Sequence, residues 1–522
     1  MALQVNDCGL KPARFLPRAK RDPFFAAAKK WAASAEARLQ AEAGNGCAPL
    51  LPEGKQLPRT RSHSAATPGL KAWKLPQPRK PQGELRRSTL KISARKDLAV
   101  YGILAIALAI FVFLTLSYQA VFMTYAVLSI FIFSVYLMLW NEKAADKHFA
   151  DPKLYPHVTI IIPSYNSKKT IFDCIKSCKA SDYPGRMDII VIDDCSSDGS
   201  YEMLCRMEGI KVYRKQKNAG KAAALNFGLA KAKGEIVACV DSDTYLSRDT
   251  IRKTAKHFHE GKDVGSVVAF VCTSAPKNLL QRIQEIEYWV SFGFFFKTLA
   301  MVDGLYVTPG PTALYRKKAL LSLGGYDEHN LCEDLDIALR LHKAGYKIKA
   351  CHETMVRTDV PETLPQLYKQ RLRWYRGGAA NMIKHVDLFD PKYGQFGLFV
   401  LPTMLGSGFV AALFMAWTGM FMLKSALSWA MPFAYDFNAG ISLTMIGVGN
   451  GLFVIHSGWV LGMFSVALWG YFLLKSFELA HTRFSGKYVL PLVIVAWIYP
   501  LFIGTVFMIS YIYELFGAKY SW

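Results

Sequence analysis

The sequence predicts an α/β domain with a mainly parallel sheet, set between hydrophobic helices that would span a membrane. Residues 151–360 alternate short β-branched runs with charged, helix-favouring stretches, which is the pattern of βαβ units. Residues 98–140 and the chain after Asp390 are instead rich in long apolar runs. The composition agrees, because 52% of the residues are hydrophobic although the formal net charge is +23.

Three apolar runs predict strands of the α/β domain: Val158–Ile162, Ile189–Ile192 and Ile236–Val240. They do not alternate with polar residues, so we expect both faces of the sheet to be covered. Polar motifs follow these runs directly, and ligands of such folds bind beyond the carboxyl ends of the strands. The site is therefore expected at that edge of the sheet.

A membrane hairpin is predicted at Leu98–Trp140, which is almost uncharged throughout. One helix of that length would measure about 64 Å, twice the hydrocarbon core of a bilayer. Two helices with a turn near Ser117–Gln119 resolve the mismatch. Lys and Arg residues flank the pair on both sides, and the positive-inside rule places both flanks in the cytoplasm.

Further spans are predicted at 398–423, 452–474 and 489–513, which gives five spans and an external C-terminus. The loop between the last two carries Lys and Arg and is placed inside. Residues 425–451 contain neither and are placed outside, with a re-entrant or extra helix left open there.

Residues 1–97 form a basic, Pro-rich tail with 20 Lys and Arg against 7 Asp and Glu. Apart from a short helix near Phe24–Gln40, this tail is expected to be disordered and cytoplasmic, where basic residues meet anionic lipid. The charge is not gathered on a motif that reads DNA or RNA, so nucleic acid is not expected as a partner. The ten cysteines show no C-x-x-C spacing and are expected to be reduced thiols.

The predicted organisation is a tail, a hairpin, an α/β domain, an interfacial amphipathic segment and a C-terminal membrane region of about three helices, at 1–97, 98–140, 141–364, 365–395 and 396–522.

Two pairs of carboxylates follow predicted strands. Asp241 and Asp243 end a buried strand, where two carboxylates flanking one residue can hold Mg²⁺ beside diphosphate oxygens. Asp193 and Asp194 end another strand and can accept hydrogen bonds from a base or a ribose, although such a turn is more often a helix cap. The first pair is the stronger indication of a site.

Asp334 opens a predicted helix beside Glu333, after the turn GGYDEHN. A carboxylate there complements the helix dipole, or serves as a general base for an acceptor hydroxyl. Before the C-terminal apolar runs, an amphipathic stretch carries Gln370–Trp374. Its arginines can grip a departing diphosphate and its indole can stack on a sugar; alternatively, it is an interfacial helix with Trp374 in the aromatic belt.

In this order and spacing, the motifs resemble the family 2 glycosyltransferases with a GT-A fold, over roughly Val158 to Gly378 and with membrane helices on both sides, as in processive members. The run VPETLPQLYKQRLRWYRGGA looks very like that of bacterial poly-N-acetylglucosamine synthases. GKAAALNFGLAKAKGE resembles their segment before the metal motif, and PGPTALYR is similar to hyaluronan and chitin synthases. The resemblance implies a cytosolic GT-A domain, the fold of transferases that use nucleotide-diphospho-sugars.

The resemblance also implies roles for matching residues. Those implied to bind substrate are Tyr165, Asp193 and Asp194 at the uridine, Lys221 at the diphosphate, Asp241 at the nucleotide, and Gln370, Arg371, Arg373 and Trp374 over the diphosphate and acceptor. Asp243 would hold Mg²⁺ or Mn²⁺, and Asp334, with Glu333 beside it, would be the catalytic base. Relatives usually carry Thr-Glu-Asp, whereas Cys332 precedes Glu333 here, which puts hydrogen bonding on the acceptor side in doubt.

For function, the resemblance implies a membrane-integrated inverting enzyme that polymerises a UDP-sugar, with UDP-N-acetylglucosamine as the leading donor. The implied partners are the donor, the growing polysaccharide and the bilayer of the cell membrane; an accessory membrane subunit or a homo-oligomer is left open. A hyaluronan-like copolymer synthase, a β-glucan synthase and a non-processive transferase to a lipid carrier are alternatives. A transporter or scaffold with a decayed transferase domain is disfavoured, because every expected acidic position is filled.

Overall fold

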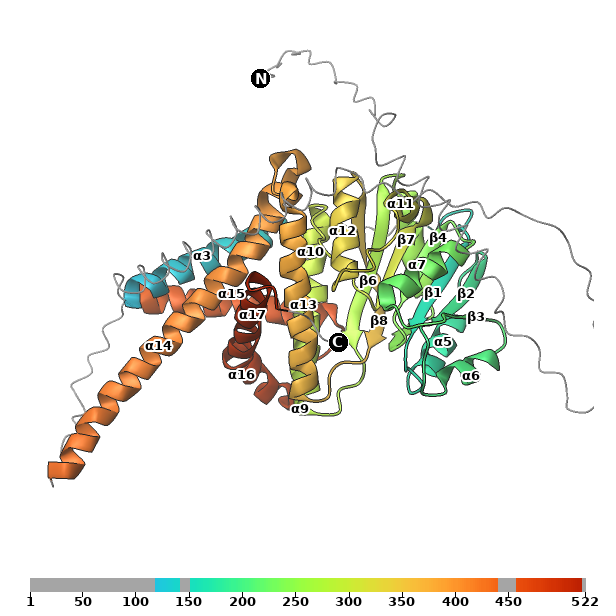
Figure 1. Ribbon diagram of the computed structural model, residues 1–522. Coiled ribbons are helices and arrows are strands. Elements are labelled where there is room, and N and C mark those ends of the chain that lie inside the picture. Colours follow the sequence, from blue (N-terminus) through green and yellow to red (C-terminus); the bar gives the residue numbers. More distant parts are fainter. Residues whose placement is uncertain (1–117, 141–150, 440–456, 519–522) are drawn as a thin grey trace, which may run out of the picture.

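The computed structural model describes residues 118–140, 151–439 and 457–518. Figure 1 shows an α/β domain on one side of the molecule and a group of long helices on the other. The basic tail, including the helix predicted near Phe24–Gln40, and the first helix of the predicted hairpin lie outside the described residues. Helix α3 (Tyr118–Leu139) lies where the second helix of the hairpin was predicted.

The α/β domain is built on one eight-stranded sheet in the order β3-β2-β1-β4-β7-β6-β8-β5. The strands are β1 (Val158–Ser164), β2 (Met187–Asp193), β3 (Lys211–Arg214), β4 (Ile236–Val240), β5 (Thr244–Leu246), β6 (Val264–Thr273), β7 (Thr312–Arg316) and β8 (Lys347–Thr358). The three strands predicted from apolar runs are confirmed as β1, β2 and β4.

The prediction of a mainly parallel sheet holds for one half of it. Strands β3, β2, β1 and β4 are parallel neighbours. In the other half, β7 runs antiparallel to both β4 and β6, and β5 runs antiparallel to β8, while β6 and β8 are parallel. The parallel half therefore presents several strand ends at a single edge.

Helices cover both faces of the sheet (Figure 1). Those of the domain are α5 (Ile171–Lys179), α6 (Ser200–Cys205), α7 (Lys221–Lys231), α8 (Thr250–Lys256), α9 (Leu279–Tyr288), α10 (Phe296–Met301), α11 (Lys317–Ser322) and α12 (Glu333–Lys343), with the short turns η1 (His257–His259) and η2 (Trp289–Phe295), the latter a π-helix.

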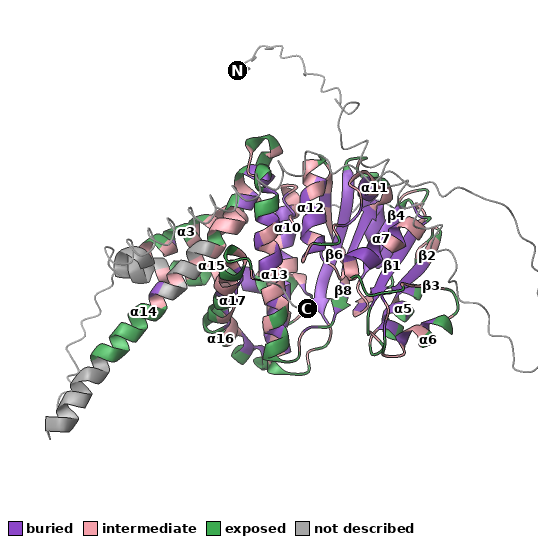
Figure 2. Cartoon of the chain, in the orientation of Figure 1, coloured by how far each residue is buried: buried purple, intermediate pink, exposed green. Residues whose placement is uncertain are grey.

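Successive residues of β1 point to opposite faces of the sheet and so enter two separate cores. Ile161 packs with α7 and α12, whereas Ile160 and Ile162 pack with α5 and α8. Every residue of β1 and of β4 is buried, as their lack of alternation predicted. Figure 2 shows the strands as a buried layer between the helices.

Helix α13 (Leu364–Lys384) carries the QRLRW segment and lies between the sheet domain and the C-terminal helices (Figure 1). It begins with a capping box, in which Thr363 and Gln366 satisfy each other's backbone N–H groups. Pro365 lies in its first turn, where the missing N–H is not needed. The helix packs along α17 (Tyr499–Leu515).

After α13 come η3 (Val386–Leu388), η4 (Pro391–Tyr393), the π-helix η5 (Phe396–Val400), α14 (Leu401–Ala439), α15 (Ser457–Leu479), η6 (Gly486–Tyr488), α16 (Val489–Trp497) and α17. Residues 425–439, predicted as a loop with a re-entrant or extra helix left open, are helical and continue α14 to Ala439. Lys424 lies exposed inside that helix. Lysine is a good helix former, so it marks a change of polarity along a helix without ending it.

Within the described residues, no single helix meets the length and hydropathy expected of a membrane span. One bent pair does so by length and composition: Gly486–Trp497 together with Tyr499–Leu515, at 41°. Pro500 lies in the first turn of α17, next to the break. Its ring and its missing N–H interrupt the helix there.

Candidate active site

The polar motifs after β1, β2 and β4 open on one edge of the sheet, as predicted, because these neighbours run parallel. Ser164 at the end of β1 lies opposite Asp193 at the end of β2. The loops that follow are tied together, since the Asn166 N–H donates to Ser196 Oγ at 3.0 Å. Tyr165 follows β1 at this edge, and its side chain is 52% exposed to solvent.

Asp194 fixes the start of helix α7. Its Oδ2 accepts hydrogen bonds from the N–H groups of Gly220 (2.7 Å) and Ala219 (3.2 Å), and its Oδ1 accepts from the Lys215 ammonium (2.7 Å). Gly220 has a φ of +87°, a backbone conformation that favours glycine. Because Lys221 is the next residue, Asp194 determines where that side chain starts.

Asp193 is fully buried beneath the same edge. Its Oδ2 accepts from the Ser196 N–H (3.2 Å) and lies 3.4 Å from Arg214 Nε. Its Oδ1 is buried without a hydrogen-bond partner among the described residues. An unpaired buried acceptor is costly, so Asp193 is the aspartate of this pair that retains capacity for a donor.

Lys221 lies between two acidic residues. Its Nζ is 2.5 Å from Asp241 Oδ1 and 3.3 Å from Glu333 Oε1. Burial alone would lower the pKa of Lys221, but the carboxylates of Asp241, Glu333 and Asp334 raise it well above its usual value. The side chain expected to approach a diphosphate thus links the end of β4 to the start of α12. A bound diphosphate would compete with these carboxylates for the ammonium.

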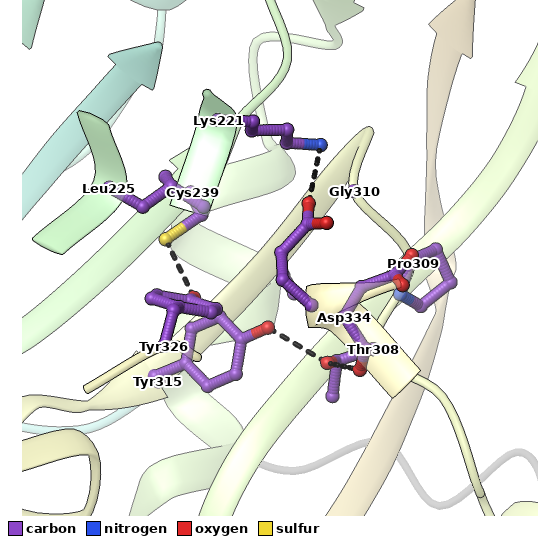
Figure 3. A pocket seen from close by; sticks show the side chains of 11 residues that line it. Lys221, Leu225, Cys239, Thr308, Pro309, Gly310, Tyr315, Tyr326 and Asp334 are labelled. Carbon is purple, nitrogen blue, oxygen red and sulfur yellow. Dashed lines mark hydrogen bonds and ion pairs between the residues drawn. The ribbon is translucent and has the colours of Figure 1, made fainter. Parts of the chain in front are cut away.

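A narrow cavity is lined by Lys221 and Asp334 and continues to Tyr315 (Figure 3). The Tyr315 hydroxyl donates to Thr308 Oγ1 at 2.8 Å, and Thr308 Oγ1 donates to the Asp334 carbonyl oxygen, also at 2.8 Å. These hydrogen bonds hold the backbone of Asp334 from below. The cavity therefore has a charged rim and a rigid floor.

Asp334 has the properties of a general base. Its Oδ1 accepts from the Leu335 N–H at 2.8 Å. Burial raises the pKa of Asp334 to about 6, with Glu333 adding to the rise and Lys221 and Arg373 opposing it. Such a carboxyl is ionised at neutral pH and is more basic than an ordinary aspartate, which favours proton transfer from a hydroxyl.

Asp243 lies in an environment with excess negative charge. Burial raises the pKa of Asp243 to about 6, and Asp241 and Asp359 add to the rise. Among the described residues, no group of three His, Cys, Asp or Glu side chains is placed to hold a metal ion alone. Asp241 and Asp243 nevertheless fit Mg²⁺ or Mn²⁺, which can take their other ligands from water and substrate phosphates.

Helix α13 brings Arg373 and Trp374 to the side of α12. Arg373 Nη1 donates to the Leu331 carbonyl at 3.3 Å, and its charge reaches Asp334. Trp374 is half-buried and packs against the core that contains α7 and α12. These two residues of the QRLRW segment are therefore beside the expected base.

Arg371 is a residue of the QRLRW segment that the structure does not bring to the cavity of Lys221 and Asp334. Its side chain is 1% exposed and pairs with Glu287 of α9 at 2.6 Å. Glu287 also accepts from the Tyr499 hydroxyl at 2.7 Å, and Gln370 Oε1 accepts from Arg371 Nη1 at 3.0 Å. The guanidinium lies 4.2 Å from the Trp374 ring. Arg371 thus joins α9, α13 and α17 behind that indole, because a buried guanidinium requires a carboxylate partner.

The family model "Glycosyl transferase family 2" matches residues 159–324, which run from β1 to the end of α11 and include strands of both halves of the sheet. This segment is a family 2 glycosyltransferase domain. The match includes Tyr165 and both pairs of strand-end aspartates, and it ends before Asp334.

The chain also resembles curated proteins over about half of its length. The chain is 31% identical over 248 residues to the poly-β-1,6-N-acetyl-D-glucosamine synthase of Staphylococcus aureus (strain COL), which covers 47% of this chain and 60% of that protein. It is 29% identical over 257 residues to the enzyme of the same name from Staphylococcus epidermidis, covering 48% and 62%. The chain thus spans about three fifths of the length of these relatives.

Two solved structures resemble the chain more remotely. A mannosyltransferase from Pyrobaculum calidifontis, in complex with GDP-Man and Mn²⁺, has a TM-score of 0.48 at 19% identity and covers 69% of this chain and 97% of its own. S. aureus TarS 1–349 in complex with UDP-GlcNAc has a TM-score of 0.33 at 18% identity, covering 50% and 81%. Neither likeness is strong enough to support a functional statement.

Sequence reasoning missed several residues that shape the site of the family 2 domain. Lys215 and Arg214 neutralise the two aspartates after β2. A Cβ on Gly310 would lie 2.6 Å from both Lys221 Nζ and Asp241 Oδ2, so any side chain there would displace this ion pair. The run TPG gave a signal for a turn there, but nothing in the sequence indicated which ion pair the turn would meet.

Cys332, the departure from the usual Thr-Glu-Asp, is buried between α12 and α13. Its Sγ lies 3.7 Å from the Arg373 carbonyl oxygen and 3.8 Å from that of Trp374. The thiol thus occupies a contact between two helices. A substituent at Gly377 of α13 would collide with it.

Proposed function

We propose that the chain is a membrane-integrated, inverting glycosyltransferase that polymerises UDP-N-acetylglucosamine into a β-linked polysaccharide and passes it across the cell membrane. The observation that carries the proposal is the placement of Asp334. It has a raised pKa, shares a cavity with Lys221 and lies beside Arg373. This arrangement suits a base next to a diphosphate leaving group.

The proposed reaction is a single displacement. Asp334 takes the proton of the acceptor hydroxyl, and the hydroxyl oxygen attacks the anomeric carbon of the donor on the face opposite the diphosphate. The bond from that carbon to the phosphate oxygen breaks, and its electron pair leaves with UDP. An α-linked donor thus gives a β-linked product, and Asp334 releases its proton to water. Lys221 turns from Asp241 to the diphosphate as negative charge grows there.

Asp241 and Asp243 are the residues proposed to hold Mg²⁺ or Mn²⁺. The bound ion supplies positive charge at the leaving diphosphate. The raised pKa of Asp243 supports this assignment, because a cation would relieve the mutual repulsion of the carboxylates.

The donor is proposed from the printed activity of the curated relatives, the poly-β-1,6-N-acetyl-D-glucosamine synthases. Trp374 is proposed to present its open face to an acceptor sugar, since Arg371 covers part of the indole. We propose that α3 and α14 to α17 hold the domain at the bilayer with its catalytic face and N-terminus in the cytoplasm. Their exposed apolar side chains support this arrangement.

The test is a radiolabelled donor screen on the full-length protein, purified and returned to lipid vesicles, with Mg²⁺ or Mn²⁺. UDP-N-acetylglucosamine, UDP-glucose and UDP-glucuronate are supplied singly and in pairs. Asp334→Asn is the inactive control, and exposed Asp263→Asn on the domain surface is the matched active control. Membrane integration is tested by carbonate washing of membranes that contain the chain.

High-molecular-weight product from UDP-N-acetylglucosamine alone, lost in Asp334→Asn only, is the expected outcome. Product from another single donor would correct the sugar, and product only from a pair would indicate a copolymer. A short labelled lipid without polymer would overturn the polymerase assignment in favour of a non-processive transferase. Release of the chain by carbonate would overturn membrane integration.

A further inference from the structure

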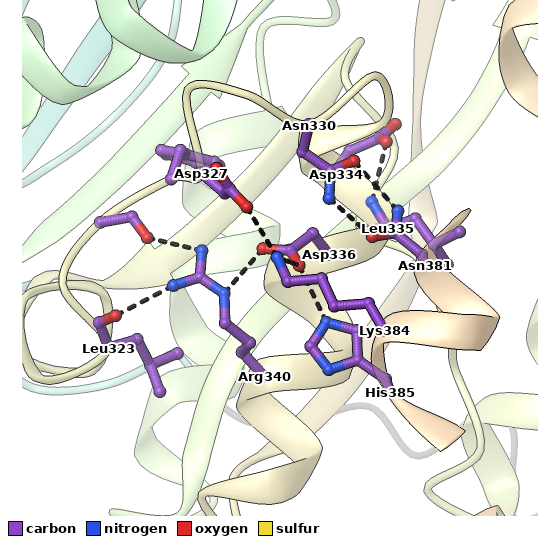
Figure 4. A network of polar contacts seen from close by, with 12 residues as sticks. Leu323, Asp327, Asn330, Asp334, Leu335, Asp336, Arg340, Asn381, Lys384 and His385 are labelled. Atoms are coloured by element: carbon purple, nitrogen blue, oxygen red, sulfur yellow. Dashed lines mark hydrogen bonds and ion pairs between the residues drawn. The ribbon is translucent and has the colours of Figure 1, made fainter. Parts of the chain in front are cut away.

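The second aspartate of α12, Asp336, is the centre of a buried polar network (Figure 4). Its side chain is fully buried. One oxygen accepts from Arg340 Nε at 2.7 Å, and the other from Lys384 Nζ at 2.6 Å and His385 Nε2 at 2.8 Å. Burying a carboxylate is costly unless it is paired and hydrogen-bonded, and three donors meet that requirement here.

The network joins three parts of the chain that are distant in sequence. Arg340 also donates to the carbonyl oxygens of Leu323 (2.9 Å) and Gly325 (2.6 Å), in the turn between α11 and α12. Lys384 and His385 form the end of α13. Asp336 therefore joins α12 to the end of α13 directly, and Arg340 extends the network to the turn before α12.

A second set of contacts reinforces the junction between α12 and α13. Asn381 of α13 and Asn330 exchange side-chain hydrogen bonds at 2.6 and 3.2 Å. Asn381 also donates to the Cys332 carbonyl at 3.2 Å. Both contacts lie on the segment immediately before Glu333 and Asp334. The first turn of α12 is thus attached to α13 from both sides.

We propose that Asp336 is a positioning residue, which clamps α12 to the end of α13 so that Asp334 and the Arg373–Trp374 pair keep a fixed separation. The inference rests on the proposed function, in which Asp334 is the base. Residues two apart on a helix point in roughly opposite directions. Asp334 therefore faces the cavity, while Asp336 faces Arg340, Lys384 and His385, with which it forms the clamp. One helix can thus serve both roles.

Loss of the Asp336 charge leaves Arg340, Lys384 and His385 with a weaker shared acceptor. The junction then relaxes, and Asp334 moves relative to the donor site. A displacement of about 1 Å at a reacting group is enough to cost roughly 100-fold in rate. The uridine end, held by Asp193, Asp194 and the loops after β1 and β2, is not part of the network and keeps its geometry.

The experiment compares Asp336→Asn with Asp387→Asn in the full-length protein. Asp387 is a matched control, because it also joins α12 to the segment after α13 through Lys343 at 2.6 Å, but its side chain is 54% exposed. Turnover is measured per UDP-binding site. We expect kcat of Asp336→Asn to fall roughly 10- to 100-fold with the donor KM and the UDP Kd within about 3-fold of wild type. Asp387→Asn should match wild type.

Hydrogen exchange provides a readout that does not depend on activity. We expect the amides of residues 327–339 to exchange at least about 10-fold faster in Asp336→Asn and at the wild-type rate in Asp387→Asn. If Asp336→Asn matches Asp387→Asn in both kcat and exchange, the proposal is wrong. A loss of UDP-binding sites with unchanged kcat per site would reduce Asp336 to a purely structural role. If wild type makes no polymer, the proposed function fails. The hydrogen-exchange comparison of the two variants then tests by itself whether Asp336 holds α12 to α13.

Two milder variants serve if Asp336→Asn does not fold. Lys384→Gln removes one charge beside Asp336 and also breaks the ion pair of Lys384 with Asp327 (2.7 Å), whereas His385→Gln replaces only the ring donor. In both variants Asp336 keeps its ion pair with Arg340. Each is expected to lower kcat roughly 3- to 10-fold with unchanged donor KM, and to accelerate exchange over residues 327–339. Wild-type values in both variants would overturn the proposal.

Discussion

Two carboxylates of helix α12 lie two residues apart in opposite environments. Asp334 is in the cavity of the family 2 domain, where burial and the neighbouring Glu333 raise its pKa to about 6. Asp336 is in the clamp against α13. Burial there would raise its pKa, but hydrogen bonds from His385 and Lys384 and the charge of Arg340 hold it well below the usual value.

The contrast separates residues that serve chemistry from residues that serve the fold. In the clamp, Arg340, Lys384 and His385 surround the charge of Asp336, so ionised Asp336 stabilises the native state. In the cavity, burial and neighbouring carboxylates raise the pKa values of Asp334 and Asp243, so their surroundings disfavour the ionised forms. Such unfavourable placement is typical of catalytic and ligand-binding groups.

Replacing each carboxylate by its amide should produce the largest difference between them. Asp334→Asn is expected to lower polymer synthesis by about 10³-fold or more, since it removes the base, while UDP binding is retained. The same change should raise stability at pH 7 by about 1–3 kcal/mol, because it removes a charge that the fold disfavours.

Asp336→Asn should have the opposite effect on stability, a loss of about 3 kcal/mol, because it breaks a buried ion network. Thermal unfolding of both variants in the same detergent shows whether each substitution raises or lowers stability relative to wild type. Changes of the same sign would show that the two environments are not opposed.

Removal of divalent cations tests the other end of the cavity. Chelation is expected to lower activity by more than about 100-fold, with recovery on adding Mg²⁺ or Mn²⁺. Asp243→Asn should increase the metal concentration needed for half-maximal activity by about 10-fold or more, whereas Asp263→Asn should not change it. Full activity after chelation would argue against a metal at Asp241 and Asp243.

The pH dependence should distinguish the two carboxylates by a smaller effect. Asp334 must be ionised to act, so kcat at saturating metal should rise with an apparent pKa near 6 and fall about 10-fold at pH 5. Protonation of Asp334 between pH 6 and 4 should increase the free energy of unfolding, because the disfavoured charge is lost. The pKa of Asp336 lies below this range, so its contribution to stability is kept there and is lost only in stronger acid. A flat kcat profile from pH 5 to 7 would exclude Asp334 as the base.

The smallest expected effects come from two adjacent glycines of α13. A Cβ on Gly377 would lie 2.9 Å from Cys332 Cβ, whereas a Cβ on Gly378 would meet nothing within 4 Å. Gly377→Ala should therefore separate α12 from α13, at a cost of about 1–3 kcal/mol in stability and with reduced turnover. Gly378→Ala should leave activity unchanged and add about 0.5–1 kcal/mol, because alanine favours a helix. Equal behaviour of the two variants would show that the close approach of these helices is unimportant.

Local patterns predicted much of the donor side of the domain. The β-branched runs gave β1, β2 and β4, and parallel neighbours necessarily bring Asp193 and Asp241 to one edge. The antiparallel strand β7 was not predicted, because Thr312–Arg316 is short and its partner β4 lies far away in sequence. The span pattern placed α15 to α17 approximately, but it did not predict that α14 continues to Ala439.

The acceptor side depends on contacts that spacing alone does not reveal. Arg371 and Arg373 lie in one motif, yet one pairs with Glu287 of α9 and the other lies beside Asp334. The spacing of Asp336 and Arg340 on one helix could have suggested their ion pair. That Lys384 and His385 share the same carboxylate follows only from the packing of α13 on α12.

The buried thiol of Cys332 lies in the contact between α12 and α13, so its reactivity reports whether that contact opens. Burial, together with the charge of Asp334, raises the pKa of this thiol, and thiols react with alkylating reagents as thiolates. Modification therefore requires α12 and α13 to part. Cys205, which is exposed, reacts without such opening and provides an internal reference. If α12 and α13 stay joined while sugars are added, Cys332 will be alkylated no faster during synthesis than at rest, relative to Cys205. A faster reaction during synthesis would show that the two helices separate.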